Sequence, residues 1–217
     1  MTSTFFISIS ALEAFALLTS TLNIFRFKVG WYLKDITVMS VVLALSSYLM
    51  RIVLEVPWFD IPLTMCAIII FMKFTIRVKP QYAVILTLSG YAFYTAFQAV
   101  IFLLLKFTID FDSSILMETN GLYIYLLQIA TAGMTMLVAY LLKVIGYGFT
   151  FIIHPPHSDN KFSKKENTVF YAAIVTFLIL TAAAVFLLSG YLWLGSIIVL
   201  LNFSLLYYLL HRRSEQD

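Results

Sequence analysis

Charged residues are scarce in this chain. They make up 12% of the 217 residues, whereas hydrophobic residues make up 62%. A soluble domain usually has about 25% charged and about 45–50% apolar residues. A chain this short and this apolar cannot cover a water-soluble surface. The composition therefore excludes an ordinary soluble domain and predicts that the lipid bilayer surrounds most of the protein.

Cysteine and catalytic motifs are also nearly absent. The one cysteine, Cys66, excludes an intramolecular disulfide, and no Cys/His cluster has metal-ligand spacing. Neither a P-loop nor an H-E-x-x-H or G-x-S-x-G motif occurs. The basic residues are spread between hydrophobic runs and form no continuous basic face, which argues against nucleic acid as a partner. We expect no enzyme activity, no cofactor and no metal.

Long hydrophobic runs are abundant. A membrane-spanning helix needs about 20 apolar residues, and the runs predict an all-α bundle forming a single integral membrane domain over residues 1–217. Charged and turn-forming residues separate seven predicted spans, at residues 4–25, 36–54, 61–76, 81–107, 121–142, 168–188 and 191–210. We interpret Glu55 to Asp60 as a tight acidic turn. The apolar stretch 143–153 fits either an interfacial segment or an extension of the fifth span.

Basic residues alternate between the predicted loops. Twelve of the fourteen Lys and Arg residues fall on one side, and only Arg51 and Lys106 fall on the other. Because Lys and Arg accumulate in cytoplasmic loops, the pattern predicts a multi-pass protein of the bacterial cytoplasmic membrane, with its N-terminus outside and its C-terminus in the cytoplasm.

Glu13 and Arg51 are the strongest candidates for a binding site. Glu13 is the only acid in the middle of a predicted span. Burying an ionisable group at that depth costs free energy, so such a residue indicates a function. The alternative is a protonated, purely structural Glu13. Arg51 lies about one turn below the outer end of the second span, where it either pairs with Glu13 or extends to the outer headgroups. An inward-facing Arg51 would be able to receive a carboxylate.

Uncharged residues complete the predicted ligand site. The mid-span amides Gln98, Gln128 and Asn202 either link helices through hydrogen bonds or contact a ligand. We assign Gln98 and Gln128 to the ligand site. Trp58 lies in an outer turn beside Arg51 and joins the site as an aromatic contact.

One short pattern resembles a known family. Residues Ser46 to Arg51 read Ser-Ser-Tyr-Leu-Met-Arg, and Val56-Pro57 and Pro62 follow before the next hydrophobic run. This pattern resembles the membrane sensor regions of Gram-positive quorum-sensing-type sensor histidine kinases. The resemblance implies a bundle of five to seven helices that receives a signal outside and whose last helix leads to a cytoplasmic kinase. The kinase sequences themselves are missing here, so we do not expect this chain to phosphorylate anything.

Two functions remain after these exclusions. The first is a receptor-like sensor or regulatory protein that binds a small or peptide signal from outside and acts on a kinase or another cytoplasmic partner, as a monomer or a homodimer. The second is a small transporter or channel that uses Glu13 as a proton or cation site. A transporter is expected to gather several polar residues at the bilayer midplane or to contain broken helices. A third alternative is a structural partner subunit.

Overall fold

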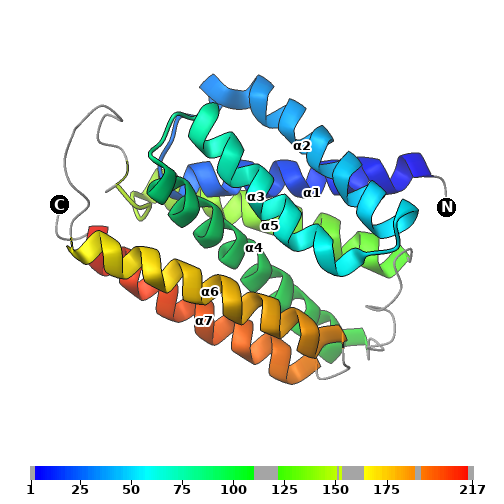
Figure 1. Ribbon diagram of the computed structural model, residues 1–217. Helices are drawn as coiled ribbons and strands as arrows, with labels where there is room; N and C mark the ends of the chain where they lie inside the picture. The colour runs from blue at the N-terminus through cyan, green and yellow to red at the C-terminus, as the bar shows by residue number, and fades with distance from the viewer. Residues whose placement is uncertain (1–2, 110–121, 151, 153–163, 189–191, 215–217) are drawn as a thin grey trace.

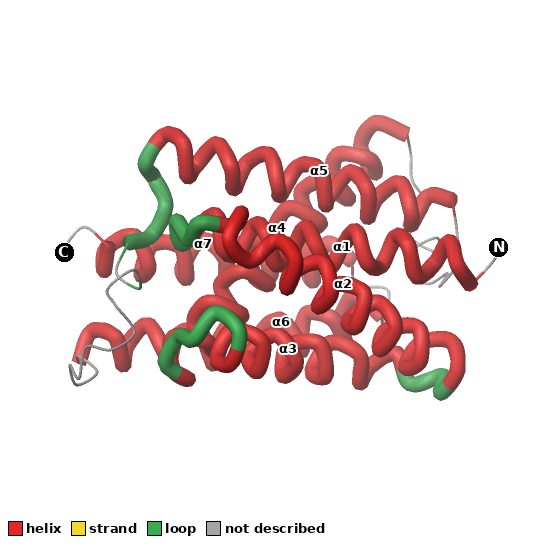
Figure 2. Tube along the Cα trace, turned by 90° about the horizontal axis from the view of Figure 1, so that it is seen from above, coloured by secondary structure: helices red, strands yellow, loops and turns green. Residues whose placement is uncertain are grey.

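The computed structural model describes residues 3–109, 122–150, 152, 164–188 and 192–214, and within these ranges every regular element is a helix. The helices run along roughly one common direction (Figures 1 and 2). In chain order they are α1 (Ser3–Ile24), η1 (Val29–Tyr32), α2 (Leu33–Tyr48), η2 (Leu49–Val53), α3 (Pro57–Phe74), α4 (Pro80–Ile109), α5 (Leu122–Ile145), α6 (Lys164–Leu188) and α7 (Leu192–Ser214).

Six helical stretches are long and apolar enough to cross a membrane: Ser3–Ile24, Val29–Val53, Pro57–Phe74, Pro80–Lys106, Tyr123–Ile145 and Leu194–Arg212. The apolar part of α6, Asn167–Ala182, is shorter. The prediction of an all-helical bundle is therefore confirmed for the described residues, and the six stretches are consistent with a membrane protein. The six stretches overlap six of the seven predicted spans.

Helix α4 lies at the centre of the bundle, where it packs against α1, α3, α5, α6 and α7. Gly90 permits the close approach of α4 to α1. A Cβ atom at Gly90 would lie 1.9 Å from Thr21 Oγ1 and 2.7 Å from Thr21 Cβ, which is far inside van der Waals contact. The absence of a side chain at this position sets the spacing of α1 and α4, the two described helices that contribute the most residues to the buried core.

The turn between α2 and α3 differs from the prediction. Residues Glu55 to Asp60 were expected to form one turn, yet α3 begins at Pro57 and Asp60 lies within its first turn. Proline favours the first position of a helix because its missing N–H would have no partner there. Before the turn, α2 changes into the π-helix η2, and the chain reverses at Glu55 with φ 56°. The predicted acidic turn is therefore wrong at its second half.

The stretch 143–153 begins as an extension of α5 and then leaves the helix. Helix α5 ends at Ile145, and Gly146 takes the left-handed conformation with φ 94°, which favours glycine and is typical of a helix C-terminus. The backbone N–H of Phe149 then donates to Ile24 O at 2.8 Å. The buried Phe149 ring lies 5.3 Å from that of Phe25 and 5.6 Å from that of Tyr207. This segment therefore joins the end of α1 to α7.

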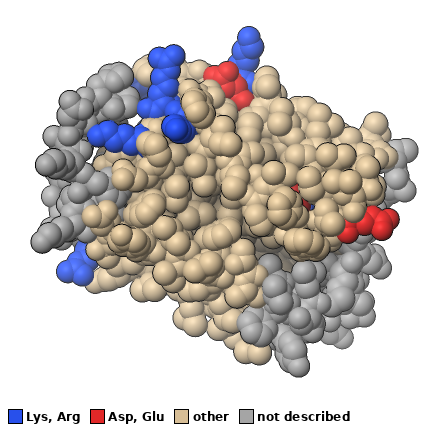
Figure 3. Space-filling view, viewed as in Figure 1, with Lys and Arg blue, Asp and Glu red and all other residues tan. Residues whose placement is uncertain are grey.

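Lys and Arg side chains gather toward one end of the bundle, the end at which the C-terminus lies (Figure 3). Lys143 belongs to this end, where its ammonium donates to Asn23 Oδ1 at 3.1 Å and to Phe27 O at 2.7 Å. Arg26 donates to Gly146 O across the same region. These bonds fasten the α1–η1 turn to the end of α5.

Candidate functional site

A polar cavity of about 240 Å³ lies inside the bundle. A smaller hollow of about 80 Å³ adjoins it. The two share the wall residues Glu13, Arg51, Ile61, Tyr91, Thr95 and Gln98. The wall is assembled from α1, η2, α3, α4, α5, α6 and α7, so that residues distant in sequence meet at one place.

The cavity lies in the half of the bundle that contains the N-terminus. At about 1.5 Å per residue, Glu13 stands about 15 Å along α1 from Ser3, and Gln128 stands about 9 Å along α5 from Leu122. Asp60 is only about 4.5 Å from the first residue of α3. Glu13 therefore lies far from the first residue of α1, whereas Asp60 lies close to the first residue of α3.

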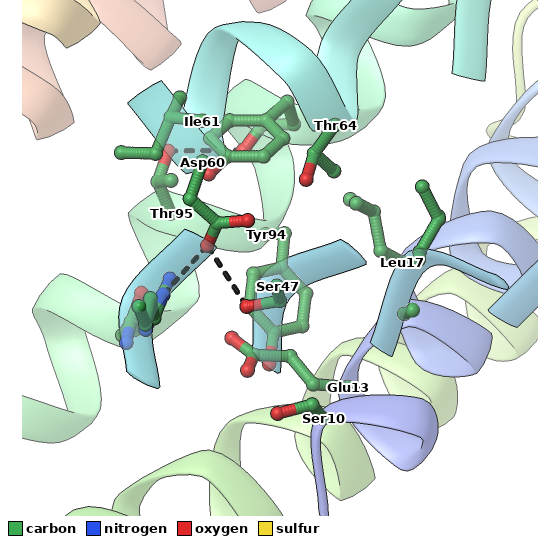
Figure 4. A pocket seen from close by; sticks show the side chains of 14 residues that line it. Ser10, Glu13, Leu17, Ser47, Asp60, Ile61, Thr64, Tyr94 and Thr95 are labelled. Carbon is green, nitrogen blue, oxygen red and sulfur yellow. Dashed lines mark hydrogen bonds and ion pairs between the residues drawn. The ribbon is translucent and has the colours of Figure 1, made fainter. Parts of the chain in front are cut away.

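Arg51 forms an ion pair with Asp60. Its Nε atom donates to Asp60 Oδ2 at 2.6 Å, and Ser47 Oγ donates to the same oxygen at 2.9 Å (Figure 4). The Asp60 side chain is 4% exposed, whereas that of Arg51 is 34% exposed and lines the cavity. A charge-assisted hydrogen bond of this length is among the stronger interactions in a protein. It fixes η2 against α3 beside the cavity.

Glu13 is held by α5. Gln128 Nε2 donates to Glu13 Oε2 at 3.0 Å. The Tyr94 side chain of α4 lies next to the Glu13 carboxyl group (Figure 4). Glu13 therefore lies between α4 and α5 and belongs to the wall of both hollows.

One buried oxygen atom at the site, Asp60 Oδ1, has no hydrogen-bond partner among the described residues. Asp60 is only 3% exposed and lines the smaller hollow. The Tyr94 hydroxyl group interacts with the Glu13 carboxyl group. Buried polar groups are almost always paired, and leaving one unpaired costs about 1–3 kcal/mol. The site therefore has unused capacity for hydrogen bonding.

The charges at the site are unequal. Glu13 and Asp60 supply two carboxyl groups, while Arg51 is the one Lys or Arg among the described residues that line the two hollows. The Arg51 charge is engaged by Asp60 at 2.6 Å. An ionised Glu13 therefore has no cation dedicated to it.

Apolar side chains also line the larger cavity. They are Ile61, Ala99, Phe102, Leu127, Leu180 and Val199. Polar and apolar side chains share one space, as is typical of small-molecule sites, in which a few polar groups orient a mainly apolar ligand.

Four of the five residues assigned to the ligand site from sequence line this cavity, namely Glu13, Arg51, Gln98 and Gln128. Trp58 does not line either hollow. It is 69% exposed, and its ring packs edge-on against that of Phe59 at 5.9 Å. Asn202 instead links α7 to α6, since Thr176 Oγ1 donates to Asn202 Oδ1 at 3.4 Å.

Neither expectation for Arg51 describes its contact. Its hydrogen-bonded partner is Asp60 rather than Glu13, and its side chain lines the cavity instead of extending to headgroups. Sequence reasoning missed Asp60 because the residue was placed in a turn. Pro57 was the available signal, since a helix that begins at proline brings Asp60 into its first turn.

Within the described part of the chain, no group of three or more His, Cys, Asp and Glu residues is close enough to hold a metal ion. Cys66 is a free, exposed thiol on α3. Comparison of the chain with protein-family models, curated proteins and solved structures finds no match.

Proposed function

We propose that this chain is a receptor-like membrane protein that binds a small ligand in the cavity around Glu13 and Arg51. The convergence of polar side chains carries this proposal. Glu13, Arg51, Gln98 and Gln128 come from four helices and line one space together with apolar side chains. The volume of about 240 Å³ is below the range of about 300–1,000 Å³ typical of pockets for drug-sized ligands. A small molecule suits this space better than a folded peptide.

The proposal includes an orientation. We place the N-terminus outside a bacterial cytoplasmic membrane, with seven spans and the basic end of the bundle in the cytoplasm. The support is the charge distribution, since Lys and Arg favour cytoplasmic loops. In this orientation the cavity lies in the outer half of the bundle, where it would receive a ligand from outside.

Signal transmission would use α5 and α7. Helix α5 carries Gln128 at the cavity, and the segment after its other end contacts the end of α7. Thr150 N donates to Ser214 Oγ at 3.3 Å, and the Thr150 and Ser214 hydroxyl groups lie 3.2 Å apart. A ligand that moved Gln128 would bias this contact and so act on a partner bound at the C-terminal end. The resemblance to kinase sensor regions supports a kinase as that cytoplasmic partner.

A binding screen on the purified full-length protein tests the proposal. Small molecules of varied charge would be scored by the rise in melting temperature, since a ligand that binds only the folded state stabilises it by mass action. Ala99→Trp fills the cavity, because Ala99 is a wall residue that is 9% exposed. Ala130→Trp is the matched control, because Ala130 is exposed on α5 and lines neither hollow.

We expect compounds that stabilise the wild-type protein and Ala130→Trp but not Ala99→Trp. If every stabilising compound acts equally on Ala99→Trp, the cavity is not the binding site. If no compound stabilises the wild-type protein, the receptor proposal fails.

A small transporter or channel with Glu13 as a proton or cation site is the second candidate. One observation favours it, namely that α2 is interrupted by the π-helix η2 directly at Arg51. Such interruptions are frequent at functional sites, and broken helices are common at transport sites. Reconstituted vesicles separate the two functions. A transporter moves the stabilising compound across the bilayer, and loses this flux in Glu13→Gln. A receptor binds the compound without flux.

A further inference from the structure

We infer that the ligand is a small organic cation, a primary ammonium group on an apolar body, and that Glu13 is its counter-ion. This inference rests on the proposed binding function and deepens it by naming the chemical class of the ligand. It arises from three properties of the site: its charge, its carboxyl oxygen acceptors and the apolar side chains that line the cavity.

The charge comes first. Arg51 and Asp60 form an ion pair at 2.6 Å, and Ser47 donates a hydrogen bond to the same Asp60 oxygen. Glu13 forms no ion pair with a described residue, and it shares the charge of Arg51 with Asp60. Inside a bundle surrounded by lipid an unpaired carboxylate is strongly unfavourable. A bound cation removes that cost, whereas an anion would add a third negative charge beside two carboxyl groups.

The hydrogen-bonding capacity agrees with the charge. An ammonium group offers three donors and no acceptor. The buried Asp60 Oδ1, which lines the adjoining smaller hollow, lacks a partner in the described part of the chain. Gln128 donates to Glu13 Oε2, and the Tyr94 hydroxyl interacts with the same carboxyl group. The oxygen atoms of two carboxyl groups are therefore the acceptors that the site offers to an ammonium group.

The apolar side chains that line the larger cavity indicate the chemical character of the rest of the ligand. Phe102, Leu127, Leu180 and Val199 line the larger cavity together with Glu13 and offer no charged group. A cation buried there would also adjoin the Tyr91 ring, and aromatic faces attract cations. An aryl or alkyl body of a few carbon atoms fits a space of about 240 Å³.

Three compounds of nearly equal shape test the charge directly. They are 2-phenylethylammonium, neutral 2-phenylethanol and anionic phenylacetate, each added to the purified full-length protein. We expect the ammonium compound to raise the melting temperature by about 5–10 °C at about a hundred times its Kd. The alcohol and the carboxylate should give much smaller shifts at the same concentration.

Glu13→Gln should abolish the preference for the ammonium compound. The substitution keeps the size of the side chain, and its amide oxygen can still accept a hydrogen bond from Gln128. Asp35→Asn is the matched control, since it makes the same chemical change at an exposed carboxyl group at the start of α2, and it should respond like the wild-type protein. The comparison of the three compounds on the wild-type protein stands even where Glu13→Gln does not fold.

Several results would overturn the inference. Equal stabilisation by the ammonium compound and the alcohol would mean that a proton, not the ligand, neutralises Glu13. Stronger stabilisation by phenylacetate would assign the site to carboxylates. In both cases loss of the effect in Ala99→Trp would leave the receptor proposal intact while the ligand class is rejected. A lack of response to all three compounds, or an undiminished ammonium effect in Glu13→Gln, also rejects the class.

Discussion

Arg51 Nε and Asp60 Oδ2 lie 2.6 Å apart and join the π-helix η2 to the first turn of α3. The contact converts an irregular backbone, which reverses at Glu55 with a positive φ, into one defined arrangement beside the cavity. Such a π-helix keeps its geometry only where the surroundings support it, and irregular turns of this kind are frequent at functional sites.

Breaking this pair should destabilise the protein. Removal of one partner leaves a buried charge uncompensated, which typically costs about 3–5 kcal/mol. We expect about 3 kcal/mol for Arg51→Gln or Asp60→Asn, since the Arg51 side chain is 34% exposed. The double substitution should cost less than the sum of the single ones. The free energies of unfolding of the wild-type protein, the two single variants and the double variant, measured in detergent, test this expectation. Losses that add up in the double variant would show that the two residues do not interact.

The two amides at the cavity should behave differently. Gln128 donates to Glu13 at 3.0 Å, whereas Gln98 lines the cavity without a hydrogen bond to any described residue. Gln128→Met should therefore lower stability by about 1–3 kcal/mol, because it leaves a carboxyl oxygen unpaired. Gln98→Met should leave stability within about 0.5 kcal/mol, the range of changes that disturb no particular feature. Equal losses in the two unfolding transitions would contradict the assigned roles.

The contact between α1 and α4 should not tolerate a methyl group at Gly90. A Cβ atom there would lie 1.9 Å from Thr21 Oγ1, so Gly90→Ala should cost about 1–3 kcal/mol through overpacking. Gly133→Ala is the matched control, since nothing lies within 4 Å of its Cβ position. That substitution should be neutral or stabilising by up to about 1 kcal/mol, because alanine is the better helix former. Melting temperatures that fall equally in both variants would refute the close approach.

The proposed orientation can be checked at two described turns. Glu55 lies between η2 and α3, and Lys28 lies between α1 and η1, at opposite ends of the bundle. In a Cys66→Ala background, a thiol reagent that cannot cross the membrane should label Glu55→Cys in intact cells and leave Lys28→Cys unlabelled. Both thiols should react after the membrane is permeabilised. The reverse pattern in intact cells would invert the topology.

Composition and the length of the hydrophobic runs predicted most of the architecture. The spans at residues 4–25 and 81–107 differ from α1 and α4 by few residues, because a helix that crosses a bilayer needs a minimum apolar length. The helical position of Asp60 was not predicted, since the acid looked like a loop residue. Its burial depends on the ion pair with Arg51, nine positions earlier in the chain.

The candidate site was predicted as a set of residues and not as an arrangement. Glu13 and Gln128 were each notable as polar residues within apolar spans, yet their contact joins positions 115 residues apart. Hydrophobic patterns identify which residues lie within the membrane but do not specify which helices become neighbours. The burial of Phe149 was not predicted for the same reason, because it depends on ring contacts with Phe25 and Tyr207.

The central claim is that Glu13, Arg51 and Gln98 face an open cavity that attracts cations, and a thiol placed at Gln98 tests it most directly. Cationic and anionic methanethiosulfonate reagents would be applied to Gln98→Cys in a Cys66→Ala background, with rates normalised to a free thiol in solution. Ala130→Cys, exposed on α5, reports the behaviour of a thiol outside the cavity. We predict that the thiol at position 98 reacts, that the cationic reagent is favoured by about tenfold, and that Glu13→Gln removes the preference. An unreactive thiol at position 98, or one that prefers the anionic reagent, would contradict the account.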